Sequence, residues 1–320
     1  MNSRHLVDPE LRDLLTYFEA MNLEPLGVDN LIERRGMGVA FPDPGDDGVS
    51  VEVRRVPGPE GAPDVELRVM RPSGATGPLP VIYHMHSGGY VVGTAAEYEP
   101  ICRPLVAPLG CAVVSVDYRL APEAPHPGPI EDCYAGLAWV FRNAAAEGFD
   151  PTRIGVKGES AGGGLAAALA LLARDRGEFA LAFQALIYPM IDDRTGSGSE
   201  PHPYAGEFLW TAETNRFGWA SLLGRDPGGA DVSAYAAAAR ADDLSGLPPA
   251  FVYTGALDLF LEENIEYVRR LARAGVPVEF HIFPGAYHAF EFQSEAAITR
   301  QAHELTLAAL RRFLAPPPAR

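Results

Sequence analysis

The chain contains 320 residues and carries a formal net charge of −16 at pH 7, from 42 acidic and 26 basic residues. Hydrophobic residues make up 47% of the chain and charged residues 21%, a composition typical of globular proteins, which excludes a wholly disordered chain. Strong net acidity repels phosphate backbones and anionic lipid headgroups, so we expect neither nucleic acid nor a membrane surface as a partner.

The cellular compartment is predicted from three further features. No apolar run reaches the ~18 residues of a membrane helix, and the first residues lack the apolar core of a signal peptide. The three cysteines, Cys102, Cys111 and Cys133, form no Cys-x-x-Cys pair, which favours buried thiols in a reducing compartment. We therefore expect a cytoplasmic protein.

The first 48 residues differ from the rest of the chain. Leu11, Leu14, Leu15 and Phe18 follow a helical spacing. We interpret residues 1–48 as a helical segment added to a core that begins at residue 49.

Eight short runs that follow have the character of β-strands. The first two alternate apolar and polar residues, whereas several later ones are almost continuously apolar, as in strands buried on both faces. The runs are Val51–Val56, Val65–Met70, Val81–Met85, Cys111–Val116, Arg153–Val156, Phe183–Tyr188, Ala250–Thr254 and Val278–Phe283. Helical patterns cover Pro129–Ala146, Ala161–Arg174, Leu261–Ala274 and Ser294–Leu314. This order predicts an α/β fold with a mostly parallel, eight-stranded sheet and an antiparallel start.

The long stretch between Tyr188 and Ala250 interrupts the alternation because it contains no good strand. Its aromatic part, Phe208–Leu223, has a helical pattern. We predict an insertion over residues 190–235 that packs over one end of the sheet. The core then comprises residues 49–189 and 236–320.

The strongest chemical signal is the pentapeptide Gly-Glu-Ser-Ala-Gly at residues 158–162. A predicted strand precedes it and an Ala/Leu-rich helix follows, which is the setting of a nucleophile elbow. In such a turn the serine adopts a strained backbone conformation, and a Cβ at Gly158 or Gly162 would strike the neighbouring strand or helix. We predict Ser160 as the nucleophile, at the carboxyl edge of the sheet and above a helix N-terminus.

A serine hydroxyl needs a base to take its proton, and His288 fits that role. It lies in the loop after the last strand, and this loop reaches the same sheet edge as Ser160. Other histidines have no such relation to the elbow: they precede a glycine turn, lie within the last strand, or lie in loops and at the N-terminus (His84, His86, His281, His126, His202 and His5).

The base needs a carboxylate to orient it. Asp258 follows the preceding strand, and the order Ser160, Asp258, His288 is the order of α/β-hydrolase triads. Glu262 and Glu263 are rival carboxylates, but we interpret them as the solvated first turn of the next helix.

Acyl transfer also needs backbone N–H groups around a developing oxyanion. The residue after the nucleophile, Ala161, supplies one. The loop after the third strand contains Gly88 and Gly89, which allow the main chain to turn its amides toward a ligand. We predict these three residues as the oxyanion hole.

Several sequence blocks together resemble the bacterial hormone-sensitive-lipase-like carboxylesterases of the α/β-hydrolase fold, from about residue 80 to the C-terminus. His-Ser-Gly-Gly at 86–89 is similar to the family's His-Gly-Gly-Gly, and Asp-Tyr-Arg-Leu-Ala-Pro-Glu at 117–123 matches a family run. Gly-Glu-Ser-Ala-Gly-Gly at 158–163 is similar to Gly-Asp-Ser-Ala-Gly-Gly, and the 255–258 and 285–290 segments match the acid and histidine loops.

The resemblance implies that Ser160, Asp258 and His288 form a triad, with Gly88, Gly89 and Ala161 as oxyanion donors. It implies that the N-terminal segment and the 190–235 insertion form a cap over the site. It also implies hydrolysis of short acyl esters without a cofactor or metal. Two departures stand out: Ser87 replaces the first glycine of the oxyanion motif, and Glu159 replaces the more frequent Asp, which we expect to be benign.

The run at 117–123 has a structural interpretation, because it contains no nucleophile or base. Pro122 and Pro125 enforce an extended exit from a buried strand. We expect Asp117 and Arg119 to pair and hold that exit in place.

Function is predicted as a serine carboxylesterase acting on short- to medium-chain acyl esters, with a small-molecule ester as substrate. The alternatives are an amidase or acyltransferase on the same scaffold, or a non-catalytic ligand-binding protein of the same fold. A homodimer is plausible because the last strand is expected at the sheet edge. Candidate pocket residues are Tyr90, Tyr188, Phe208, Leu209 and Phe290. The aromatic residues of the insertion either line a pocket or pack the cap onto the core; they are Tyr204, Phe208, Trp210, Phe217 and Trp219.

Overall fold

The computed structural model describes residues 3–21, 24–38, 47–198 and 201–316. In this part of the chain eight strands form one sheet in the order β1-β2-β4-β3-β5-β6-β7-β8. The strands are β1 (Val49–Val56), β2 (Val65–Pro72), β3 (Leu79–Met85), β4 (Ala112–Asp117), β5 (Phe149–Glu159), β6 (Gln184–Ile187), β7 (Ala250–Gly255) and β8 (Val278–Phe283). β2 pairs antiparallel with β1 and β4, and all other pairs are parallel. The predicted sheet, with its antiparallel start, is confirmed.

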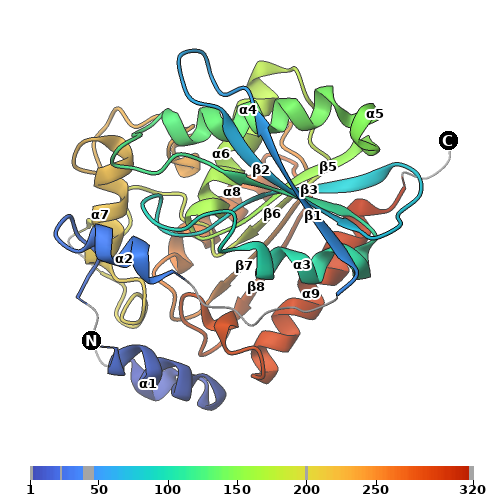
Figure 1. Cartoon of the computed structure of the whole chain (residues 1–320). Coiled ribbons are helices and arrows are strands. Elements are labelled where there is room, and N and C mark those ends of the chain that lie inside the picture. Colours follow the sequence, from blue (N-terminus) through green and yellow to red (C-terminus); the bar gives the residue numbers. More distant parts are fainter. Residues whose placement is uncertain (1–2, 22–23, 39–46, 199–200, 317–320) are drawn as a thin grey trace.

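Helices cover both faces of this sheet (Figure 1). The α-helices of the described residues are α1 (Arg12–Ala20), α2 (Leu31–Met37), α3 (Glu99–Leu109), α4 (Gly128–Arg142), α5 (Ala144–Glu147), α6 (Ala161–Arg176), α7 (Ala212–Leu223), α8 (Leu261–Arg273) and α9 (Ala297–Leu314). Short 3-10 helices span Arg4–Leu6, Pro9–Leu11, Ala238–Arg240 and Phe290–Phe292. α3 and α9 lie on one face, where Cys102 and Leu310 share a core cluster. On the other face α4, α6 and α8 form the main core with the sheet.

Two differences from the predicted helices have local causes. α3 was not predicted, and it contains Pro104 and Pro108, which lack the N–H that a helix interior uses. Burial of Cys102, Leu105 and Val106 against the sheet supports it. The predicted Pro129–Ala146 helix divides at Asn143 into α4 and α5.

The expected pair between Asp117 and Arg119 is wrong. Arg119 donates through Nε and Nη2 to both carboxylate oxygens of Asp132 on α4, at 2.7 and 2.8 Å. Asp117 instead accepts a hydrogen bond of 2.7 Å from the Ala95 N–H. β4 ends at Asp117, so the alternation of a strand no longer places Arg119 on the same face as Asp117, and each side chain finds a partner elsewhere.

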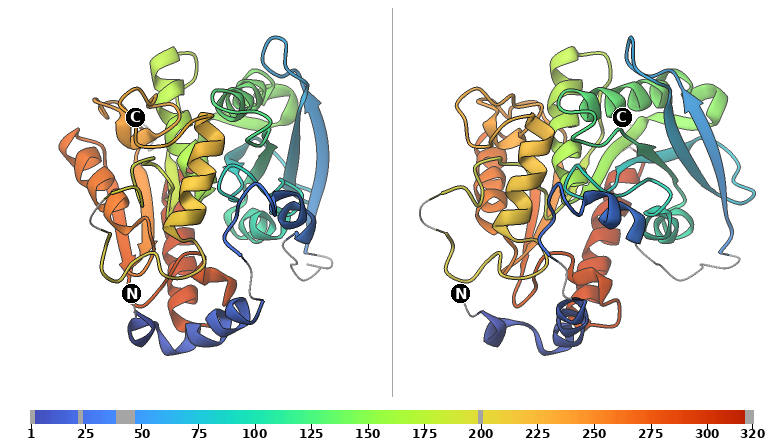
Figure 2. Two further views of the ribbon diagram at one scale, coloured as in Figure 1. Left: turned by 90° about the vertical axis from the view of Figure 1, so that its left-hand side faces the viewer. Right: turned by 60° about the vertical axis from the view of Figure 1, so that its left-hand side comes forward.

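The N-terminal segment and the insertion meet at one end of the sheet. Figures 1 and 2 show α2 beside α7 there, while α1 lies below the sheet near α9. Leu31 of α2 shares an apolar cluster with Phe217 of α7, and the Leu26 N–H lies 3.4 Å from Thr214 Oγ1. None of the helices in the described ranges is long and apolar enough to cross a membrane.

Candidate active site

Ser160 lies in the turn between β5 and α6, with φ 54° and ψ −120°. These angles are strained for a residue with a side chain. Gly158 and Gly162 flank the turn at very close backbone approaches: an added Cβ would lie 2.2 Å from the Gly162 carbonyl oxygen and 2.1 Å from the Met85 carbonyl oxygen, respectively. The predicted elbow geometry is therefore present.

Replacing Gly162 with alanine is expected to destabilise the protein by about 2 kcal/mol or more, because its Cβ would overlap two backbone carbonyls that cannot rotate away. Thermal unfolding should show a clear fall in Tm. Gly229→Ala is the matched control, because nothing lies within 4 Å of its added Cβ. Equal Tm values for the two variants would contradict the close packing of the elbow.

His288 lies between Ser160 and Asp258. Its Nε2 is 3.0 Å from Ser160 Oγ, and its Nδ1 is 2.8 Å from Asp258 Oδ2. Ser160 is 3%, His288 6% and Asp258 0% exposed, so the three side chains are shielded from bulk water. Asp258 also accepts 2.9 Å from the Phe260 N–H, which holds the carboxylate in place. The structure thus brings together the three predicted residues in a nucleophile–base–carboxylate arrangement.

Aromatic rings surround the imidazole of His288. The rings of Tyr188 and Phe260 meet it edge-on, with centroids at 4.6 and 5.2 Å, and Trp210 lies at 6.1 Å. These contacts restrict the imidazole to the orientation that reaches both partners.

Glu263, one of the two rival carboxylates, is not solvated as predicted. It is 7% exposed and accepts hydrogen bonds of 2.7 and 3.3 Å from the Ile191 and Asp192 N–H groups. Burial raises the pKa of Glu263 well above its usual value. It ties α8 to the start of the insertion and makes no contact with His288, whereas Glu262 is exposed.

The glycine loop after β3 has the conformation expected of an oxyanion loop. Gly88 and Gly89 have φ of 120° and 60°, which only glycine adopts readily. A Cβ on Gly88 would lie 1.9 Å from the Val92 carbonyl oxygen, and one on Gly89 would lie 2.1 Å from the ring of Trp210. Within the described residues, neither glycine N–H donates to a protein acceptor, so both are available to a ligand.

Hydrogen bonds of Ser87 and His86 stabilise the conformation of this loop. Ser87 Oγ donates to Tyr98 Oη at 2.5 Å, and His86 Nδ1 lies 2.7 Å from the Ser87 carbonyl oxygen. The His86 ring stacks on Tyr118 at 4.2 Å, and Tyr118 Oη donates to the His86 carbonyl. Burial lowers the pKa of His86 to about 4, so its imidazole is neutral near pH 7. The Ser87 side chain is thus hydrogen-bonded to Tyr98.

A cavity of about 480 Å³ opens onto Ser160 and His288. Its wall comes from four parts of the chain: the glycine loop with the residues that follow it, the N-terminal segment, the insertion, and the segment from His288 to Phe292. From the N-terminal segment, the wall includes Phe18, Leu26 and Arg35. From the insertion, it includes two of the predicted pocket residues together with their neighbours; these are Phe208, Leu209, Trp210, Thr211 and Thr214.

The other three predicted pocket residues lie behind the cavity wall. Tyr90 is fully buried and donates from Oη to the Met190 carbonyl at 2.7 Å. Tyr188 packs edge-on against His288 and Tyr253, and Phe290 is buried against Phe283.

The other aromatic residues of the insertion divide between surface and core. Tyr204 is 47% exposed, Phe217 packs against α2, and Trp219 is fully buried beside Tyr90.

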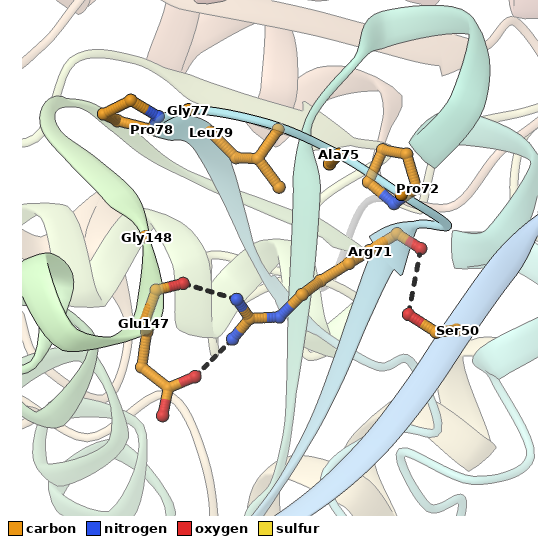
Figure 3. Close-up of a pocket in the computed structure, with 10 residues that line it drawn as sticks. Ser50, Arg71, Pro72, Ala75, Gly77, Pro78, Leu79, Glu147 and Gly148 are labelled. Atoms are coloured by element: carbon orange, nitrogen blue, oxygen red, sulfur yellow. Dashed lines mark hydrogen bonds and ion pairs between the residues drawn. The ribbon is translucent and has the colours of Figure 1, made fainter.

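A second pocket lies at the opposite edge of the sheet, where β3 and β5 begin (Figure 3). Arg71 donates there to the carbonyl and the carboxylate of Glu147, and Ser50 Oγ lies 3.4 Å from the Arg71 carbonyl oxygen. The charged groups of this pocket, Arg71 and Glu147, are already paired with each other. We therefore interpret the pocket as a structural contact between β2 and the end of α5, and not as a reaction site.

The sequence did not predict which N-terminal residues line the cavity, because their contact with the site is formed between segments far apart in the chain. The contacts among Lys157, Glu159 and His84 were not predicted either, because the sequence indicates Glu159 only as a motif departure and His84 only as a histidine before a glycine turn.

Comparison with known proteins agrees with this geometry. A family model described as alpha/beta hydrolase fold matches residues 82–292. Carboxylesterase NlhH of Mycobacterium tuberculosis is 35% identical over 314 residues, which is 96% of both chains. A solved bacterial heroin esterase superposes with a TM-score of 0.90 at 39% identity, covering 98% of this chain and 100% of that one. Esterase LipW from Mycobacterium marinum gives 0.81 at 32% identity, with 98% of each chain covered.

The chain therefore belongs to the alpha/beta hydrolase fold family, in its hormone-sensitive-lipase-like carboxylesterase group. The predicted class of enzyme, a carboxylic-ester hydrolase, is confirmed by the same relatives.

Proposed function

We propose that this protein is a serine carboxylesterase that hydrolyses short- to medium-chain acyl esters through an acyl-enzyme. The observation that carries the proposal is the continuous hydrogen-bonded chain from Ser160 Oγ through His288 to Asp258, which opens into a cavity. Acyl transfer uses this arrangement of nucleophile, base and orienting carboxylate on several folds.

In the first half of the reaction, His288 Nε2 takes the proton of Ser160 Oγ as the oxygen attacks the ester carbonyl. The tetrahedral oxyanion receives hydrogen bonds from the N–H groups of Gly88, Gly89 and Ala161. Asp258 stabilises the imidazolium that forms. His288 then gives the proton to the departing alcohol, and the C–O bond of the ester breaks to leave the acyl-enzyme.

In the second half, a water molecule takes the place of the alcohol. His288 accepts its proton while the water oxygen attacks the acyl carbonyl, and the same N–H groups hold the second oxyanion. Proton return to Ser160 Oγ releases the carboxylic acid. No redox change or group transfer beyond the acyl group is needed.

The test uses an ethyl or hexyl p-nitrophenyl phosphonate followed by intact-mass analysis and peptide mapping. We expect one adduct, on Ser160, with loss of esterase activity in proportion. Activity that survives full labelling would contradict the proposal. Adding an alcohol or amine to an ester reaction separates the alternatives: transfer products in excess of hydrolysis identify an acyltransferase, and faster cleavage of anilides than of esters identifies an amidase.

Turnover of p-nitrophenyl esters from acetate to palmitate is expected to peak at short or medium chains. The cavity is only about 480 Å³ and is walled by the N-terminal segment and the insertion, which we propose act together as a cap. Removing apolar area from water favours longer chains only while the acyl group still fits. A profile that rises to palmitate would contradict the proposed chain-length preference.

We also propose a homodimer formed by the edge strand β8, since the sheet ends there and Ile282 is 44% exposed. Size-exclusion chromatography with light scattering at micromolar concentration should give twice the chain mass. A monomer at all concentrations would remove this proposal. We place the enzyme in the cytoplasm on the sequence features alone.

A further inference from the structure

A row of polar side chains crosses the sheet directly below the site. Ser115 on β4 and Lys157 on β5 are the register partners of His84 on β3, so the three side chains share one face of three adjacent strands. Glu159 lies two residues after Lys157 and projects from the same face. All four residues are at most 4% exposed. Lys157 is the only lysine in the sequence.

These side chains form one connected chain of contacts. Ser115 Oγ lies 2.9 Å from His84 Nδ1, and His84 Nε2 lies 2.8 Å from Glu159 Oε2. The other carboxylate oxygen, Oε1, accepts from Lys157 Nζ. Both oxygens of Glu159 are therefore held by cationic or hydrogen-donating partners from two strands.

The surroundings of Glu159 and His84 favour the charged forms of both side chains. Lys157 and His84 outweigh the burial penalty and lower the pKa of Glu159 below its usual range. Burial alone lowers the pKa of His84, but Cys102 of α3 and Glu159 raise it to about 9. Burial raises the pKa of Glu291, which lies three residues after His288, to about 8.

The network lies where two of the site's loops begin. β3 leads from His84 into the glycine loop at 88–89, and β5 leads from Lys157 through Glu159 directly into Ser160. Ser160 has a strained backbone, and such strain persists only where the surrounding structure over-determines it. A carboxylate fixed on both oxygens prevents the residue before the nucleophile from rotating.

A contribution to folding stability does not by itself account for this buried network. Buried ion pairs contribute little net stability compared with apolar residues of the same volume, because desolvation offsets their attraction. The preceding positions on the same face of β3 and β4, Ile82 and Val113, are apolar.

We propose that Lys157, Glu159 and His84 are positioning residues that hold Ser160 Oγ in line with His288 and tie the nucleophile elbow to the strand that carries the oxyanion loop. This inference rests on the proposed function. The three residues do not touch substrate; they act through the backbone of residues 159 and 160.

The first experiment compares two ways of removing the network. Glu159→Gln leaves Lys157 and His84 without their counter-charge. The quadruple variant Ser115→Ala, His84→Leu, Lys157→Met and Glu159→Leu replaces the whole row by apolar side chains. We expect kcat for p-nitrophenyl acetate to fall about 10- to 100-fold in both, with KM changed less than about twofold, because a small misplacement of a reacting group has effects of this size. Tm should fall in Glu159→Gln and recover in the quadruple variant.

The quadruple variant separates positioning from structural support. Recovery of Tm together with wild-type kcat would overturn the inference, since the network would then serve stability only. If this variant does not fold, the comparison of Glu159→Gln with Asp132→Asn decides. Asp132 is also buried and ion-paired, to Arg119, but lies outside the site. A loss of kcat in Asp132→Asn as large as in Glu159→Gln would overturn the inference.

The single lysine allows a direct check of the contact itself. Protein labelled with 15N-lysine gives one Nζ resonance, which should show slowly exchanging protons in the wild type and fast exchange in Glu159→Gln. Fast exchange in the wild type would overturn the network. Ser160→Ala keeps the two proposals distinct: if it retains turnover, the proposed function fails, whereas loss of turnover in Ser160→Ala with unchanged kcat in the network variants refutes only this inference.

Discussion

Replacing Ser160 with alanine is expected to lower kcat for p-nitrophenyl acetate by about 10⁴- to 10⁶-fold, while KM changes little. The hydroxyl 3.0 Å from His288 Nε2 is the group placed to form the covalent bond, and alanine offers no replacement. The N–H groups of the glycine loop and the cavity stay in place, so substrate still binds and a small residual rate over water remains. Stopped assays at high enzyme concentration measure this residual rate.

Ser245→Ala serves as the control for this experiment. Ser245 is exposed, and its hydroxyl donates to Asp243 in the same turn, so removing this hydroxyl should leave kcat unchanged. Circular dichroism and Tm of Ser160→Ala should match the wild type, because alanine keeps the Cβ and removes only the hydroxyl. Residual turnover above about one hundredth of the wild-type rate would show that another nucleophile carries the reaction.

Asp258→Asn is expected to lower kcat by about 10⁴-fold. The carboxylate accepts from His288 Nδ1 at 2.8 Å and from the Phe260 N–H at 2.9 Å. An amide of the same shape presents an N–H to the imidazole, which then takes the other tautomer and turns a protonated Nε2 toward Ser160. The side chain is fully buried, so water cannot supply the missing acceptor.

Glu262→Gln is the matched control, because it removes an exposed carboxylate four residues away on the first turn of α8. It should retain wild-type kcat and KM. A fall in Asp258→Asn of less than about tenfold would show that another acid orients His288. Phosphonate labelling of Ser160 should slow in Asp258→Asn to a similar extent as turnover, since both reactions need the deprotonated hydroxyl.

Motif context explains why the sequence could predict that the three candidate catalytic residues lie together. Ser160, Asp258 and His288 each follow a strand of a parallel sheet, and the carboxyl ends of parallel strands meet at one edge. A glycine-flanked serine between a strand and a helix has few other conformations. The same reasoning failed for α3, because its prolines argue locally against a helix that burial against the sheet supports.

The linear sequence by itself indicated the strands, the glycine-flanked turn and the candidate site residues, because strand periodicity, glycine and turn residues act over a few neighbouring positions. Only the tertiary structure decided which side chains meet. The ring of Trp210 lies over Gly89. Arg119 pairs with Asp132 and not with Asp117, and the Glu263 side chain is buried. Each of these depends on contacts between segments far apart in the chain, where register, packing and desolvation select the partner and no local pattern encodes it.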